Sequence, residues 1–265
     1  MPRARRPKLG QHFLVSPGYR HRIIQALPLE PDDLVIEIGP GRGAMTELLA
    51  ERVRHVVAIE LDAALASGLK ERLHAQGRVE IIQGDILSAD LAALCRERQA
   101  ENCFVYGNLP YYITSPIIHH LMDSASWIRG MALLVQREVA ERLTAGPGSR
   151  EYGYLSLLAQ LHCEGRIALR VPPGAFSPPP KVHSALVEFK MRPKFPHWSP
   201  RERARFLDFA KVCFAHKRKN LLNNLAGQFG REAVQRALTA CGISPSTRAE
   251  QMTTEQLAQL HWHLW

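Results

Sequence analysis

Four consecutive residues, Asn108, Leu109, Pro110 and Tyr111, are the part of this 265-residue chain best suited to chemistry on a nucleobase. The Asn108 side chain and the Leu109 carbonyl offer two adjacent hydrogen-bond acceptors for an exocyclic amino group such as that of adenine. The nitrogen of that group is a poor nucleophile because its lone pair is delocalised into the ring, so it needs positioned acceptors rather than a strong base. Pro110 stiffens the turn, and Tyr111 can stack on a flipped base. The alternative interpretation is an ordinary turn, which Asn and Pro favour anyway.

Three carboxylates precede this segment, each at the end of an apolar run. Glu37 stands before the glycine-rich stretch Gly39–Gly43, and Glu60 and Asp85 follow the next two runs. Glycines let the backbone approach a ligand closely, but a carboxylate beside them would repel a pyrophosphate and attract an amine. Glu60 is placed to accept from ribose hydroxyls, and Asp85 from an adenine amino group, although either could instead be an exposed or helix-capping carboxylate. Together the three acids predict S-adenosylmethionine rather than NAD.

The apolar runs that carry these residues are typical of buried parallel strands. They cover residues 34–38, 56–59, 79–82, 103–106 and 131–135, and helical patterns cover residues 44–52, 62–75 and 137–144. This alternation predicts a doubly wound α/β sheet. The proline-rich residues 172–180 exclude a helix or a central strand, and residues 184–190 alternate like a final strand.

The pattern after residue 193 is entirely helical, over residues 200–215, 217–227, 230–241 and 253–262. We therefore predict two domains, a ligand-binding α/β domain over residues 1–193 and a small all-helical domain over residues 194–265. Tryptophans Trp198, Trp262 and Trp265 are expected to be packing residues rather than base platforms.

The net charge of +9 is unevenly distributed along the chain. Residues 1–29 carry +6 and residues 194–231 carry +7, whereas residues 30–130 carry −6. Two basic flanks indicate a polyanionic partner; the alternative is a solvated surface without one.

No apolar run is long enough to span a bilayer, and the N-terminus lacks the apolar core of a secretory signal, so a cytoplasmic protein is expected. Neither the five scattered cysteines nor the twelve histidines show the spacing of a metal site, so no metal is expected.

With these motifs in order, the chain closely resembles the ribosomal RNA adenine dimethyltransferase family from about Lys8 to the C-terminal helices. The resemblance is carried by Gly10–Leu14, Val35–Gly43, Ile59–Asp62, Gly84–Leu87, Asn108–Pro116 and Val171–Ser184. It implies a Rossmann-like class I methyltransferase sheet and dimethylation of two adjacent adenines in small-subunit (16S) rRNA. It also implies cofactor contacts for His12, Leu14, Gly39, Gly41, Glu60, Asp85 and Asn108, and a base sandwich between Tyr111 and Phe176. His12 stands where many members have Asn, and His183 where many have Asp.

The hypothesis is therefore a cytoplasmic, monomeric, S-adenosylmethionine-dependent rRNA adenine dimethyltransferase of ribosome biogenesis. The reaction is in-line displacement at the sulfonium methyl, performed twice on one amine. Asn108 and the Leu109 carbonyl orient the amine, and Glu37 joins the cofactor contacts. The expected phosphate contacts are Arg5, Arg6, Lys8, Lys217, Arg218 and Lys219. The alternatives are a resistance-type 23S rRNA methyltransferase, a DNA adenine methyltransferase and an RNA-binding assembly factor, with a nicotinamide dehydrogenase more distant.

Overall fold

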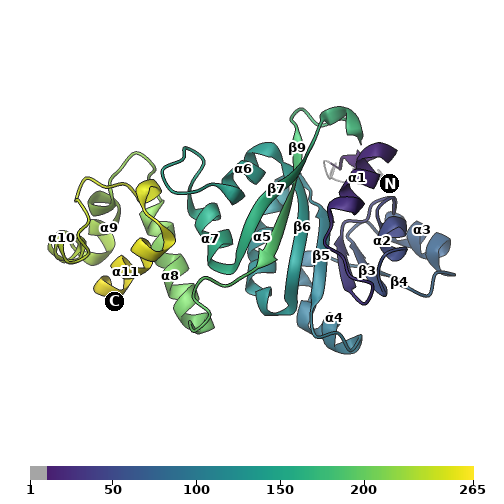
Figure 1. The fold of residues 1–265 in the computed structure, drawn as a ribbon, viewed down its shortest axis with the longest axis horizontal. Helices are drawn as coiled ribbons and strands as arrows, with labels where there is room; N and C mark the ends of the chain where they lie inside the picture. The colour runs from purple at the N-terminus through teal and green to yellow at the C-terminus, as the bar shows by residue number, and fades with distance from the viewer. Residues whose placement is uncertain (1–10) are drawn as a thin grey trace, which may run out of the picture. The chain divides into compact units, whose positions relative to one another are not determined.

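The computed structural model describes residues 11–265 (Figure 1). The predicted phosphate contacts Arg5, Arg6 and Lys8 therefore lie outside the described residues. The chain divides into two compact units, which we call the sheet unit (up to Ala140, and Arg166–Met191) and the helical unit (Glu141–Gly165 and Arg192–Trp265). The division after Met191 lies close to the predicted boundary at residue 193. Residues 141–165, however, group with the C-terminal helices, up to the strand that begins at Cys163 and enters the sheet.

A mixed seven-stranded sheet forms the centre of the sheet unit, with strand order β4-β3-β2-β5-β6-β9-β7. Strands β2 to β6 pair in parallel, and β9 pairs antiparallel to β6. The main strands are β2 (Leu34–Ile38), β3 (His55–Glu60), β4 (Val79–Gln83), β5 (Cys103–Asn108), β6 (Ile128–Gln136), β7 (Cys163–Val171) and β9 (Ser184–Met191). All five residues of β2 are buried, as expected for a strand covered on both faces. The predicted α/β class and the final strand are confirmed.

The chain reverses its direction of travel across the sheet between β2 and β5. It runs outward through β3 and β4, then returns to place β5 on the other side of β2, with Ile38 opposite Gly107. In open α/β sheets, ligands bind at the carboxyl ends of the strands beside such a switch point. The residues that follow β2 and β5 are the glycine stretch and Asn108–Tyr111, so the topology brings the two predicted motifs together.

The helices of the sheet unit connect these strands. They are α1 (Pro17–Ala26), α2 (Thr46–Ala50), α3 (Ala63–Leu73), α4 (Leu91–Glu97), α5 (Thr114–Asp123) and the first part of α6 (Arg137–Thr144). The predicted helix over residues 62–75 is confirmed, with Asp62 capping α3 by accepting from the Ala64 and Leu65 amides. The helix predicted over residues 44–52 is shorter in the structure, where α2 begins at Thr46 because the turn that starts with the glycines continues to residue 45.

Two very short strands complete this unit. β1 (Phe13–Leu14) pairs antiparallel with β8 (Phe176–Ser177), so that Leu14 lies opposite Phe176. This pairing ties the N-terminal segment to the proline-rich residues more than 160 positions later, which no local pattern indicates.

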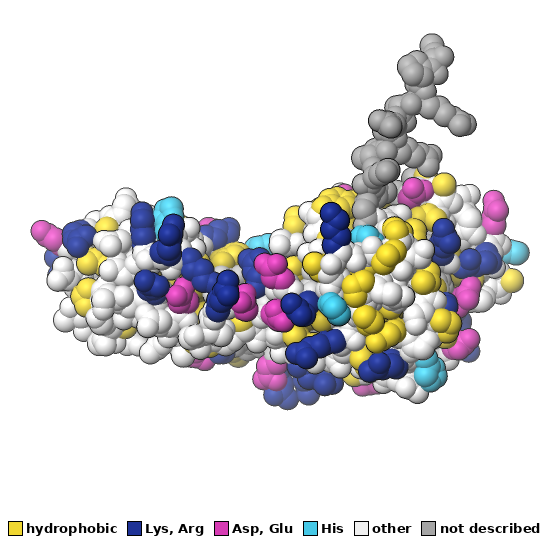
Figure 2. Space-filling view, turned by 90° about the horizontal axis from the view of Figure 1, so that it is seen from above, with side chains coloured by type: hydrophobic (Ala, Val, Ile, Leu, Met, Phe, Trp, Pro, Cys, Tyr) yellow, Lys and Arg dark blue, Asp and Glu magenta, His cyan; other side chains and the backbone are white. Residues whose placement is uncertain are grey.

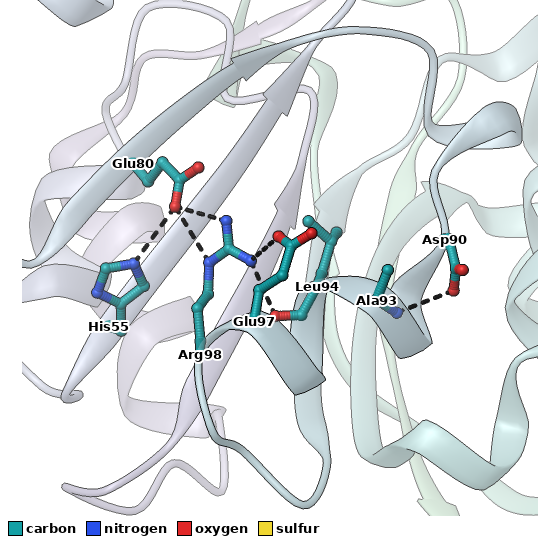
Figure 3. Close-up of polar contacts among 7 residues, drawn as sticks. All are labelled: His55, Glu80, Asp90, Ala93, Leu94, Glu97 and Arg98. Carbon is teal, nitrogen blue, oxygen red and sulfur yellow. Dashed lines mark hydrogen bonds and ion pairs between the residues drawn. The ribbon is translucent and has the colours of Figure 1, made fainter.

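An ion-pair network lies beside the first residue of β3, at the edge of the sheet opposite the carboxyl ends of the parallel strands (Figure 3). Figure 3 shows the Arg98 guanidinium between Glu80 and Glu97, and the His55 ring directed at the same Glu80 oxygen as Arg98. Arg98 Nη2 is 2.6 Å from Glu80 Oε2, and His55 Nε2 is 3.8 Å from the same oxygen. The network ties the end of α4 to β4 and β3, which is a structural role.

The helical unit has a core of its own. Its helices are α7 (Tyr154–His162), α8 (Pro200–Cys213), α9 (Leu221–Phe229), α10 (Arg231–Ala240) and α11 (Thr254–Leu264). Leu157 and Leu161 of α7 join Phe206, Phe209 and Leu257 in one buried cluster, which explains why residues 141–165 belong here. Trp198 is 5% exposed, as a packing residue should be, whereas Trp262 and Trp265 are 49% and 54% exposed. Within residues 11–265 every helix is too short or too polar to cross a bilayer.

Candidate functional site

Three residues of the glycine turn, Gly39–Gly43, adopt a backbone conformation that glycine takes up far more readily than other residues. Gly39, Gly41 and Gly43 have φ of 65°, 58° and 75°, in the left-handed region where a Cβ costs energy. A Cβ on Gly41 would also stand 2.9 Å from the Phe13 ring. The turn is thus shaped both by its own backbone and by the N-terminal segment packed over it.

Glu60 is buried and holds the glycine turn from the neighbouring strand end. Its Oε2 accepts from the Gly41 amide at 3.0 Å, and its Oε1 accepts from the Asp62 amide at 2.9 Å. Asp85 accepts from the Leu87 amide at 3.0 Å, so the helix-capping alternative for this residue is realised. Capping does not remove it from the site, because both carboxylates line the same pocket.

This first pocket lies at the carboxyl ends of β2, β3, β4 and β5. It encloses about 770 Å³ when the open space at its mouth is included. The lining residues that sequence reasoning predicted are His12, Gly39, Gly41, Glu60, Asp85, Asn108, Leu109 and Tyr111. Residues from five separate segments therefore converge on one cavity.

Asn108 is oriented by the N-terminal segment. Its side-chain nitrogen donates to the His12 carbonyl at 2.9 Å, which leaves the side-chain oxygen as the acceptor for a ligand. Leu109 is buried, and its amide donates to the Leu134 carbonyl at 3.0 Å. The Thr114 hydroxyl donates to the Pro110 carbonyl at 3.0 Å. Hydrogen bonds to the N-terminal segment, to β6 and to α5 therefore hold the turn in place, as is required of a site that acts by positioning a ligand.

Tyr111 is fixed at both its hydroxyl and its ring. The hydroxyl is 2.8 Å from Ser184 Oγ, and the His12 ring lies with its centroid 5.4 Å from the tyrosine centroid. Burial raises the pKa of the Tyr111 phenol, against the opposing effect of the Ser184 bond. The phenol therefore stays protonated at neutral pH.

Phe176 is not brought to this pocket. It lies opposite Leu14 in the β1–β8 pair and is only 3% exposed. Its ring is part of the core cluster of the sheet unit. The expected base sandwich between Tyr111 and Phe176 stays a prediction, because in this conformation the Phe176 ring is covered.

Glu37 and Leu14 line a second pocket, of about 930 Å³ including open space, which the glycine turn also lines. Gly39, Gly41 and Asn108 line both pockets, so the two adjoin. Glu37 is 2% exposed. Burial raises its pKa to about 7, against the opposing effect of the Thr46 hydroxyl and with a smaller upward contribution from Glu60.

Glu37 and its neighbour on β5 carry polar atoms without partners. Among the described residues, Glu37 Oε2 and the Tyr106 hydroxyl are buried and make no hydrogen bond that meets normal geometry. Tyr106 lies directly opposite Glu37 in the β2–β5 register. Buried polar atoms are rarely left unpaired without reason, so this cluster fits a ligand that donates hydrogen bonds and carries positive charge.

Sequence reasoning missed Arg20 of α1. It lines the second pocket, and its Nε is buried without a partner among the described residues. The only signal was the basic character of residues 1–29, which does not distinguish Arg20 from its neighbours. Within residues 11–265, no cluster of three or more His, Cys, Asp or Glu side chains has the arrangement of a metal site.

The basic residues Lys217, Arg218 and Lys219 are exposed in the helical unit. The predicted helix over 217–227 was wrong at its start, because α9 begins at Leu221 and Asn220 caps it. The three cations thus lie in a turn, where Lys217 Nζ contacts the Arg150 carbonyl. In Figure 2, Lys and Arg side chains gather on the visible face of this unit, drawn on the left.

A family model described as ribosomal RNA adenine dimethylase matches residues 3–264. The "Ribosomal RNA small subunit methyltransferase A" of Acidobacterium capsulatum is 46% identical over 256 residues, covering 96% of this chain and 89% of that protein. The protein of the same name from Latilactobacillus sakei is 42% identical, covering 95% and 87%.

Two solved structures share the fold over nearly the whole chain. The 23S rRNA methyltransferase ErmE has a TM-score of 0.72 at 28% identity, covering 95% of this chain and 99% of that one. A dimethyladenosine transferase from Plasmodium falciparum has a TM-score of 0.77 at 24% identity, covering 94% and 96%.

Proposed function

Because this chain belongs to the ribosomal RNA adenine dimethylase family, we propose that it uses S-adenosylmethionine to dimethylate adenine amino groups in small-subunit 16S rRNA. Two adjacent adenines are the proposed targets, during ribosome biogenesis. The observation that carries the proposal is the Asn108 amide, which donates to the His12 carbonyl at 2.9 Å and lines the same pocket as Glu60 and Asp85. Relatives of 42% and 46% identity carry the small-subunit name.

The residues of the two pockets fit this cofactor. In this proposal Glu60 accepts hydrogen bonds from the ribose hydroxyls, and Asp85 accepts from the adenine amino group of the cofactor. The buried Glu37 carboxylate, with its unpaired Oε2, suits the α-amino group, and Arg20 suits the α-carboxylate. Bound there, the cofactor supplies an electrophilic methyl group, so no metal is needed in this scheme.

The protein's part in the reaction is positioning. The Asn108 side-chain oxygen and the Leu109 carbonyl accept hydrogen bonds from the target amine and favour its pyramidal form, in which the nitrogen lone pair can attack the methyl carbon. The bound cofactor would supply the methyl group and keep the electron pair of the carbon–sulfur bond on its sulfur, while the amine would release one proton to solvent. One hydrogen remains for a second transfer with the same acceptors. Tyr111 holds the base.

The exposed cations of the helical unit would contact rRNA phosphates. Replacing Lys217, Arg218 and Lys219 by alanine should lower the slope of log K against log salt by roughly 2–3, because each lost phosphate contact removes about 0.7–0.9. A control that replaces the exposed Arg52, Arg54 and Lys70 removes the same charge from the acidic stretch. An equal change of slope in both variants would mean that the turn makes no specific contact.

The activity is tested by offering labelled S-adenosylmethionine with undermethylated small subunits, naked 16S rRNA, large subunits and DNA, then mapping the labelled base. Label on adenine amino groups of 16S rRNA, lost in Asn108→Ala, supports the proposal. The similarity to ErmE makes the large subunit the main rival, and label on 23S rRNA alone would establish it. Label on DNA alone would identify a DNA methyltransferase. Cofactor binding without any transfer would favour an assembly factor. The monomeric state and cytoplasmic location stay predictions.

A further inference from the structure

Tyr111 is followed by a second tyrosine whose environment is different. Both belong to one turn of 3₁₀ helix, Tyr111–Ile113, in which adjacent side chains diverge by about 120°. Tyr111 is half-buried and bonded to Ser184, whereas Tyr112 is 57% exposed. Both nevertheless line the first pocket. Tyr112 therefore stands at the mouth of the pocket, with much of its side chain facing solvent.

Large apolar side chains with this exposure are few in the sheet unit. Among its described residues the others are Val15, Leu61 and Val182, so Tyr112 is the aromatic member of the set. Within the same residues, no hydrogen bond to its hydroxyl is seen that would explain the position of the ring. An exposed aromatic ring beside a base-binding pocket is typical of surfaces that stack on nucleobases.

The proposed reaction itself creates a need for such a surface. A base can reach the Asn108 acceptors only after it leaves the stack of its own strand, and unstacking is a cost that the protein must offset. The base next to it in the strand then loses a stacking neighbour on one face. An aromatic ring at the mouth of the pocket can replace that neighbour.

We propose that Tyr112 stacks on the nucleobase adjacent to the target adenine. This inference rests on the proposed function, and in a substrate with two neighbouring adenines the stacked base is the second target. Tyr111 would then hold the base undergoing transfer while Tyr112 holds the one awaiting it. The two tyrosines would thus have different roles that follow from their burial. The anchored Tyr111 ring positions the target adenine, and the exposed Tyr112 ring binds the base next to it.

The test compares Tyr112→Ala, Tyr112→Leu, Tyr112→Phe and Tyr112→Trp on undermethylated small subunits. Tyr112→Ala should lower kcat/KM for the particle about 5- to 150-fold, because a base stacked on an aromatic side chain is worth roughly 1–3 kcal/mol and each 1.4 kcal/mol is about tenfold. Phe and Trp should restore the value, whereas Leu, which has apolar bulk without a π face, should not. S-adenosylmethionine affinity, measured by calorimetry, should stay within about twofold in all four variants.

A matched control is Trp262→Ala, which removes an aromatic ring of similar exposure from the helical unit. It should leave the ratio of dimethylated to unmodified adenine at each position unchanged, whereas Tyr112→Ala should shift that ratio. Full rescue by Leu, or weaker cofactor binding that accounts for the whole loss, would overturn the proposal by showing a packing or cofactor role. Unchanged kcat/KM in Tyr112→Ala would also overturn it while leaving the proposed function intact. Absence of transfer to rRNA by the wild-type protein would instead refute the proposed function.

Discussion

Replacing Glu37 by Gln should stabilise the free protein at neutral and alkaline pH while weakening its cofactor binding. Burial raises the Glu37 pKa from 4.5 to about 7, so the folded state binds the proton more tightly than the unfolded state. The stability linked to this group is fully present below pH 4.5 and is lost as pH rises through 7. A difference of about 2.5 pKa units corresponds to about 3 kcal/mol.

Glutamine is neutral at every pH, so the variant avoids this loss. Its free energy of unfolding, relative to wild type, should rise by about 3 kcal/mol between about pH 4.5 and 8. At alkaline pH that corresponds to roughly 6–12 °C in Tm. Urea denaturation followed by circular dichroism, without cofactor, measures the difference. The exposed glutamate Glu51 supplies the control, and Glu51→Gln should show no such pH-dependent gain.

Cofactor binding should change in the opposite direction. An ionised carboxylate bonded to the cofactor's ammonium contributes about 1.5–3 kcal/mol, so Glu37→Gln should weaken S-adenosylmethionine binding at about pH 8 by roughly 10- to 150-fold. In the wild type the affinity should fall as pH drops below about 7, because the bound form requires Glu37 to lose its proton. Identical pH slopes of stability in wild type and Glu37→Gln would refute the reasoning, since they would show that burial does not shift this carboxyl.

Three further outcomes are expected. Asn108→Ala should lower kcat by about 10²–10³, the usual effect of removing one positioned polar group, measured by single-turnover transfer to small subunits. Gly41→Ala should destabilise the protein by about 1–3 kcal/mol, because Gly41 has a positive φ and the Phe13 ring would lie 2.9 Å from the new Cβ. Gly18→Ala, on a helix where nothing lies within 4 Å of a new Cβ, should not destabilise it. Urea denaturation compares the two variants. Burial and a nearby arginine lower the His261 pKa from 6.5 to about 4, so its contribution to stability is lost as pH falls from 6.5 to about 4. His261→Phe, but not the exposed His263→Phe, should flatten the acid side of the stability profile.

The strands, and the polar residues at their carboxyl ends, could be predicted from the sequence because both are recognised from residues that are adjacent in the chain. Apolar runs ending in Glu37, Glu60, Asp85 and Asn108 predicted parallel strands and a nucleoside site, and the structure places all four beside the same glycine turn. β7 was missed because its pattern is that of a mostly exposed strand with charged residues. The start of α9 was misplaced because a basic turn and a helix surface have similar composition.

Residue types, apolar spacing and the order of the motifs thus determined the fold class and the cofactor class, and they predicted the acceptors for an amine. The tertiary structure decided how each group is held: the His12 carbonyl orients an amide 96 residues away, Glu37 becomes a weak acid through burial, and Phe176 is covered while Tyr112 is left open. The physical reason is that strand and helix patterns are local. Burial, hydrogen-bond partners and pKa depend on contacts that form only when segments distant in the chain are brought together.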